Sequence, residues 1–100
     1  MPADFNIFRQ LLQSISRDSR ITVWHLAVVF GVIQLSVCDD LSEPILVSRR
    51  QVMYLARISS ISTYHKCMKE LQDYGYIVYL PSFHPGIRSR IYFQFPVDEH

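Results

Sequence analysis

Residues 49–77, RRQVMYLARISSISTYHKCMKELQDYGYI, decide how the chain is expected to fold. Two short helical patterns follow one another here, and Ser59 and Ser60 separate them. Ser48 and Ser60 are placed to cap the two helices, because a serine oxygen can accept a backbone N–H of the first turn. Gly75 suits the left-handed conformation that closes a helix. The stretch therefore predicts two short helices joined by a tight turn.

The apolar residues of this stretch recur at helical spacing, so we expect them to face a core. In the first helix and just after it they are Val52, Leu55, Ala56 and Ile58. In the second helix they are Tyr64, Cys67, Met68 and Leu71. The opposite side of the second helix is polar and basic, and is expected to face solvent.

Strand patterns lie on both sides of the helix pair. Residues 45–47 (Ile-Leu-Val) are short and β-prone, and residues 76–80 and 90–95 alternate between apolar and polar. Residues 81–86 connect the last two runs and contain two prolines and a glycine. This composition is typical of a hairpin loop, so the end of the chain predicts a β-hairpin.

The N-terminal part of the chain predicts two further helices. Residues 5–16 carry apolar residues at helical spacing, with Asp4 as the expected N-cap and Arg17 at the end of the pattern. The apolar members are Phe5, Phe8, Leu11, Leu12 and Ile15. Residues 20–37 are almost wholly apolar, and 18 residues without a turn signal favour a helix over a strand.

A helix that is apolar all round needs burial on more than one side. We expect a second copy of the chain to cover part of residues 20–37 in a homodimer, with Val28 in the contact and Gly31 as the point of closest approach. The alternative is a self-contained monomer in which residues 5–16 fold over this helix. Polar residues such as His25 and Gln34 interrupt the stretch, so we expect no membrane span.

Length and composition predict one domain over residues 1–100. Hydrophobic residues make up 49% of the chain, enough for a core, and the formal net charge is +1. That charge is uneven, because residues 45–95 hold seven basic residues and two acidic ones. We divide the domain into N-terminal helices, residues 1–44, and a helix pair with a hairpin, residues 45–95. The expected fold class is mainly α with a small β-hairpin. The basic half of the chain, residues 45–95, suits a polyanion as partner.

Two motifs make residues 45–95 resemble a winged helix-turn-helix. Ser60-Ile61-Ser62-Thr63 opens the second helix, and Leu71-x3-Gly75-x-Ile77 closes it. The resemblance implies a winged helix-turn-helix with two extra N-terminal helices. In this family the leucine locks the second helix into the core, and the glycine turns the chain into the first wing strand.

A narrower resemblance is to small winged-helix proteins of bacterial conjugative transposons and other mobile elements. It rests on Trp24-His25, the junction from Pro44-Ile45 to Ser48-Arg49, and the segments 63–67, 75–77 and 81–85. The loop of this chain departs from the Lys-Gly-Ser usual in that group, since it reads Pro-Gly-Ile-Arg-Ser over residues 85–89. The resemblance implies a regulator of transcription or an accessory protein of excision or transfer.

Charge and resemblance together indicate sequence-specific binding of double-stranded DNA. The expected DNA-binding residues are Arg49, Arg50, Ser62, Thr63, His65, Lys66, Lys69, Arg88 and Arg90. Small hydroxyls at the start of the second helix can approach base edges, and Lys66 can reach guanine or a phosphate. The arginines of the first helix would contact the flanking backbone, and those of the hairpin a minor groove or the next phosphate.

Other interpretations stay open. The same scaffold also occurs in modules that bind proteins and never touch DNA. Arg49 and Arg50 could pair with Glu43 instead of phosphate. A set of aromatic residues is expected mainly to pack in the core and wing, with stacking on single-stranded bases as the alternative. These are Tyr74, Tyr76, Tyr79, Phe83, Tyr92, Phe93 and Phe95.

Signals for catalysis and for bound cofactors are weak. The four histidines, His25, His65, His84 and His100, are scattered without a carboxylate partner in a motif. Cys38 and Cys67 do not have zinc-site spacing, and no glycine-rich phosphate loop is present. We therefore expect no enzyme activity, no metal, no cofactor and no small-molecule ligand. Without a signal-peptide pattern at its start, the chain is expected to be cytoplasmic.

Overall fold

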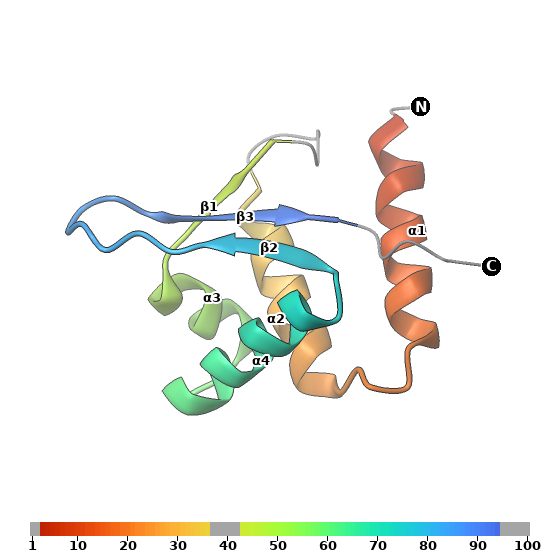
Figure 1. Cartoon of the computed structure of the whole chain (residues 1–100), viewed down its shortest axis with the longest axis horizontal. Helices are drawn as coiled ribbons and strands as arrows, with labels where there is room; N and C mark the ends of the chain where they lie inside the picture. Colours follow the sequence, from red (N-terminus) through yellow and green to blue (C-terminus); the bar gives the residue numbers. More distant parts are fainter. Residues whose placement is uncertain (1–2, 37–42, 95–100) are drawn as a thin grey trace.

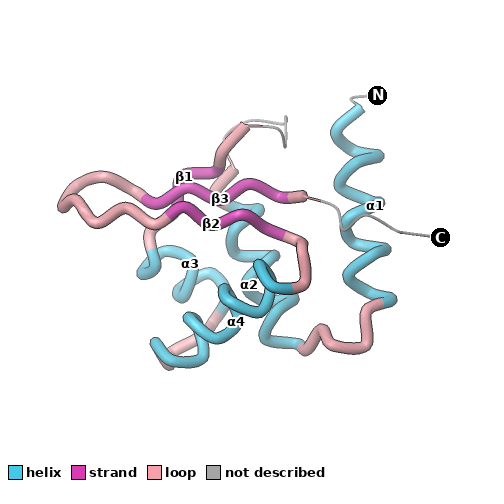
Figure 2. Tube along the Cα trace, viewed as in Figure 1, coloured by secondary structure: helices cyan, strands magenta, loops and turns pink. Residues whose placement is uncertain are grey.

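Helices make up most of the structure, a computed structural model that describes residues 3–36 and 43–94. Within these ranges the elements are α1 (Ala3–Arg17), α2 (Val23–Gln34), β1 (Ile45–Val47), α3 (Arg49–Ala56), α4 (Ile61–Asp73), β2 (Ile77–Leu80) and β3 (Ser89–Phe93). The predicted mainly α fold class is confirmed, and the four helices pack beside a small antiparallel sheet (Figures 1 and 2).

The ends of α3 and α4 follow from local chemistry. Ser48 and Ser60 each accept, at 3.2 Å, the backbone N–H three residues later, which confirms both predicted caps. Gly75 has φ of 89°, so the left-handed turn after α4 is confirmed as well. Arg57 ends α3 in the same left-handed region with φ of 61°, which the sequence did not indicate. The connection between α3 and α4 therefore runs only from Arg57 to Ser60.

The sheet has three strands in the order β1-β3-β2. Both pairings are antiparallel, with Ile45 opposite Ile91 and Leu80 opposite Arg90. The hairpin of β2 and β3 is confirmed, and β1 joins its free edge as a third strand. Residues alternate between the two faces, and the buried face carries Ile45, Val47, Ile77, Ile91 and Phe93.

The tightest helix contact joins α2 to α3. Gly31 is buried there, and a Cβ atom on it would lie 3.2 Å from the Val52 carbonyl oxygen and 3.3 Å from the Ala56 nitrogen. Val28, on the same helix, is fully buried in the core of its own chain. The expected role of Gly31 and Val28 in contacting a second subunit is therefore wrong, because both positions are occupied within one chain. The homodimer itself stays a prediction.

The first helix, α1, packs against the core of the domain. Leu11 and Ile15 are fully buried, whereas Leu12 is exposed. The helix begins at Ala3, so Asp4 lies inside it and does not cap it. The predictions for the side chains of Phe5 and Phe8, and those for Cys38, Phe95 and His100, lie outside the described residues. No helix in the described ranges is long and apolar enough to cross a membrane.

Candidate nucleic-acid interface

The nine residues expected to bind DNA come from three places in the fold. Arg49 and Arg50 form the first turn of α3; Ser62, Thr63, His65, Lys66 and Lys69 belong to α4; Arg88 precedes β3 and Arg90 lies in it. The N-terminal ends of α3 and α4 and the β2–β3 loop lie at one end of the molecule, at the left of Figure 1, and α1 lies at the opposite end. The fold therefore gathers most of these residues at one end.

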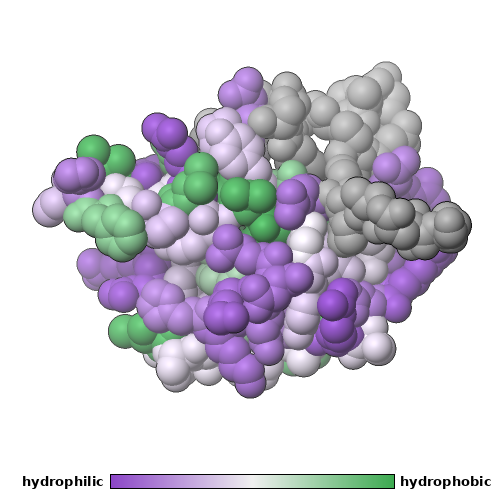
Figure 3. Space-filling model, in the orientation of Figure 1, coloured by the Kyte–Doolittle hydropathy of each residue, from purple (hydrophilic) through white to green (hydrophobic). Residues whose placement is uncertain are grey.

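One side of α4 is polar and open to solvent. Ser62, His65, Lys66 and Lys69 are exposed, while the four apolar residues predicted to face inward are all buried. Figure 3 shows hydrophilic residues over the lower front of the molecule, where α4 lies, with apolar residues along the strands above. Thr63 differs from the expected outward position, because it is half-buried on the side of the helix that carries Glu70. Its place at the margin follows from helical geometry, since it lies about 100° around the helix from Ser62.

Most of the basic side chains are free to meet an external anion. Within the described residues, eight arginines and lysines form no ion pair, and five of them are expected DNA-binding residues: Arg49, Arg50, Lys66, Arg88 and Arg90. The other three are Arg9, Arg17 and Arg57. All five expected DNA-binding residues are exposed, and neither Arg49 nor Arg50 pairs with Glu43. Lys69 is different, because its Nζ lies 3.0 Å from Asp73 Oδ2 one turn later. This exposed pair offsets part of the positive charge on α4.

Behind α4, a buried histidine links two helices. His25 is 2% exposed, and its Nε2 lies 2.9 Å from Glu70 Oε1. Its Nδ1 accepts the Thr22 backbone N–H at 2.8 Å, so the proton is on Nε2, which donates to the carboxylate. The sequence shows no motif that pairs a histidine with a carboxylate, and the fold supplies this partner to His25 from 45 positions away. Thr22-x-x-His25 is a variant of the capping box, the one local signal that could have identified it.

This histidine has a structural role, because both ring nitrogens are engaged and the ring is closed to solvent. It fixes the start of α2 to the last turn of α4. No three histidine, cysteine, aspartate or glutamate side chains come together as possible metal ligands in the parts of the chain described. Cys67 is buried, and burial raises the pKa of its thiol, which disfavours the reactive thiolate.

A polar network ties the loop after α1 to the start of β2. Asp18 accepts two hydrogen bonds from the Arg20 guanidinium, at 2.9 and 2.7 Å, and one from the Tyr76 hydroxyl at 2.8 Å. The Arg20 guanidinium also lies 4.1 Å from the centroid of the Tyr74 ring. The hydrogen bonds from Arg20 hold the pKa of Asp18 well below its usual range, and burial raises the pKa of Tyr76 to about 12. The network holds the N-terminal helix against the turn that follows α4.

Replacing Asp18 with asparagine should make stability less dependent on pH. The folded-state pKa of Asp18 is lowered, so its ionised form stabilises the fold above the unfolded-state pKa, about 3.9. This contribution is lost as the pH falls from about 5 through that value toward the folded-state pKa. Urea unfolding at several pH values should show wild type more stable than Asp18→Asn at pH 7, with the difference shrinking below about pH 4.

The matched control is Asp73→Asn, which removes a carboxylate from an exposed ion pair. Such pairs contribute about 0.3–0.5 kcal/mol, so this variant should stay close to wild type throughout. A difference between wild type and Asp18→Asn that does not change with pH would contradict the role of the network.

The aromatic residues divide between core and surface. Tyr76 and Phe93 are buried, and Tyr74, Tyr79 and Tyr92 are half-buried, so packing is confirmed for this group. Phe83 is 88% exposed in the β2–β3 loop, so the expectation that it packs is wrong. The loop that carries Phe83 extends away from the sheet (Figure 1).

Comparison of the chain with protein-family models, with curated proteins and with solved structures found no match. The candidate interface is therefore defined by its own geometry and charge.

Proposed function

We propose that this protein is a winged helix-turn-helix that binds double-stranded DNA. The helix pair α3–α4 corresponds to the helix-turn-helix, with α4 as the recognition helix, and the β2–β3 loop corresponds to the wing. The third strand, β1, leads directly into α3, which supports this assignment. The resemblance to proteins of mobile elements supports a role in transcription control or in excision and transfer.

One observation carries the proposal: five exposed basic side chains without ion-pair partners in the described residues lie on α3, α4 and the hairpin. Arginine and lysine that meet phosphates release counterions, which is the main source of affinity for DNA. The start of α4 adds the positive end of a helix dipole between these side chains. This distribution of charge favours a duplex lying across the N-terminal ends of α3 and α4.

Within this arrangement, Ser62 is the residue best placed to read bases, and Lys66 is best placed to meet a phosphate beside them. They are one turn apart on the exposed side of α4, near its N-terminal end. The N-terminal part of a recognition helix is the part that reaches base edges in the major groove. Arg49 and Arg50 then lie over the adjacent backbone, and Arg88 and Arg90 act from the wing.

A protein-binding module is the second candidate, and a specific surface favours it. The outer face of the sheet exposes Leu46, Val78 and Leu80, and the loop adds Phe83 and Ile87. An apolar surface of this kind is typical of protein contacts. The two candidates differ in which surface is essential, the exposed side of α4 or the outer face of the sheet. Arg90 belongs to the outer face of the sheet, because it lies opposite Leu46 and Leu80.

Capture of genomic DNA fragments by the purified protein tests the proposal and yields a preferred sequence. Ser62→Ala should reduce the preference for that sequence over a scrambled duplex by about 3- to 10-fold, the equivalent of one lost hydrogen bond. Thr63→Ala is the matched control, because the half-buried Thr63 lies at the margin of the exposed face. Retention of no duplex at low salt would overturn DNA binding, and an equal loss in both variants would overturn the role of Ser62.

A further inference from the structure

We infer that two copies of this chain pair through the outer face of α2, each inserting Phe30 into a groove between α2 and α3 of the other. The outer face consists of Val23, Leu26, Ala27 and Phe30. Formation of this dimer does not depend on DNA binding. The outer face lies on the side of α2 opposite the buried Val28 and Val32.

The outer face is apolar and largely open to solvent. Val23, Leu26 and Phe30 are 71%, 41% and 64% exposed, and their spacing puts them on one stripe of the helix. No aspartate, glutamate, lysine or arginine occurs in α2. Two copies of the stripe can therefore meet without bringing like charges together.

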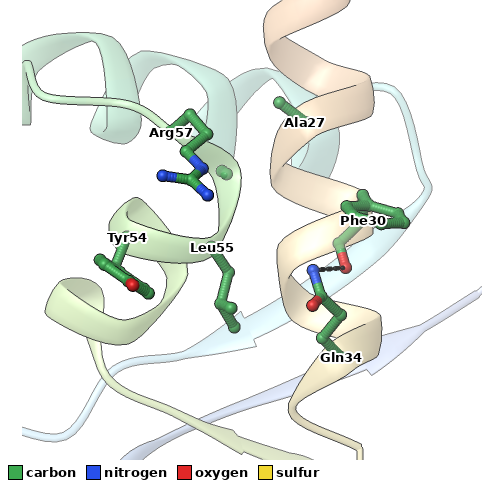
Figure 4. Close-up of a pocket in the computed structure, with 7 residues that line it drawn as sticks. Ala27, Phe30, Gln34, Tyr54, Leu55 and Arg57 are labelled. Carbon is green, nitrogen blue, oxygen red and sulfur yellow. Dashed lines mark hydrogen bonds between the residues drawn. The ribbon is translucent and has the colours of Figure 1, made fainter.

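An open groove of about 320 Å³ lies beside this stripe (Figure 4). Ala27, Phe30 and Gln34 line it from α2, and Tyr54, Leu55 and Arg57 from the end of α3. Phe30 thus projects from the wall of the same groove that can receive an aromatic ring. A protruding side chain and a groove that lie together on one surface are self-complementary, which is what a two-fold contact requires.

The arrangement favours a second copy over an acidic peptide. Among the described residues, Arg57 is the one charged residue that lines the groove, and its guanidinium lies 5.7 Å from the centroid of the Tyr54 ring. An antiparallel crossing of the two α2 helices, with the axis between Ala27 and Phe30, places each Phe30 over the small Ala27 of the partner subunit. An acidic peptide would find one cation and leave most of the apolar stripe unmatched.

The available area suits a stable, modest interface. Trp24, next to Val23 in α2, is half exposed and adds to this surface. With roughly 200 Å² for an aromatic side chain, the exposed parts of Trp24, Phe30 and Tyr54 supply roughly 400 Å². Val23 and Leu26 bring the total to about 600 Å² per copy, the lower end of specific interfaces. We therefore expect dissociation in the micromolar range.

Analytical ultracentrifugation without DNA, across micromolar concentrations, tests the pairing. Wild type should shift from 11.8 kDa to twice that mass as the concentration rises. Phe30→Glu should weaken the dimer about 10-fold or more, because it places a charge at the centre of the contact. Since Phe30 is exposed, the melting temperature of the monomer should not change.

Phe83→Glu is the matched control, with the same substitution at an exposed phenylalanine in the β2–β3 loop, and it should leave the dimer intact. Val23→Glu gives a second probe of the stripe should Phe30→Glu lower the melting temperature. A wild-type mass that stays at 11.8 kDa, or a dimer weakened equally by Phe83→Glu, would overturn the proposal. Because DNA is absent, this result is independent of the DNA-binding test.

Discussion

Replacing Gly31 with leucine is expected to lower the free energy of unfolding by about 3 kcal/mol or more, at or above the upper end for an overpacked core. Even the first added atom would lie 3.2 Å from the Val52 carbonyl oxygen and 3.3 Å from the Ala56 nitrogen. Both are backbone atoms of α3, so the clash cannot be relieved by a side-chain rotation. The helix itself must move, and the first turn that carries Arg49 moves with it.

Urea unfolding followed by circular dichroism measures this effect. Gln13→Leu is the control, because it adds the same side chain on the exposed side of α1 and should change stability by no more than about 0.5 kcal/mol. The stability of Gly31→Ala should lie between those of Gly31→Leu and Gln13→Leu, since its single methyl group meets the same backbone atoms at closer than ordinary contact. Equal stability of Gly31→Leu and wild type would contradict the close packing of α2 on α3.

Gly31 also shows where sequence reasoning succeeded and where it failed. A close approach at this glycine could be predicted, because a glycine inside a helix needs a reason. The element that packs against Gly31 could not be predicted. Because α2 is apolar on every side, it has no periodic pattern that distinguishes its buried side from its exposed one. In α4 the pattern is clear, and the predicted inward positions Tyr64 and Leu71 are both fully buried.

In the candidate site, too, local features could be predicted from the sequence and long-range contacts could not. Its caps and exposed residues depend on neighbours within one turn, so Ser60 and Lys66 were predicted correctly from spacing. The bond between His25 and Glu70 joins residues 45 positions apart, a distance at which spacing carries no information. The i, i+4 pair of Lys69 with Asp73 was readable from the sequence, and it reduces what Lys69 can contribute to binding DNA.

Removing two positive charges from the proposed interface should weaken DNA binding far more than removing two from elsewhere. The variant Arg49→Ala/Lys66→Ala takes one unpaired cation from α3 and one from α4. If each meets a phosphate, the slope of log K against log salt should fall by about 2, with a loss in affinity of about 100-fold at low salt. Fluorescence anisotropy with a labelled duplex at several salt concentrations gives both quantities.

The control is Arg9→Ala/Arg17→Ala, which makes the same change in net charge on α1, at the opposite end of the molecule (Figure 1). Both arginines are exposed, so the fold should tolerate the change, as equal melting temperatures would verify. A general attraction between a basic protein and DNA would weaken equally in both variants. If the duplex docks on α3 and α4, the slope of log K against log salt should fall only for Arg49→Ala/Lys66→Ala. The reason is that counterions are released where phosphates are contacted and not in proportion to net charge. Equal slopes in the two variants would therefore contradict an interface on α3 and α4 even if the protein binds DNA.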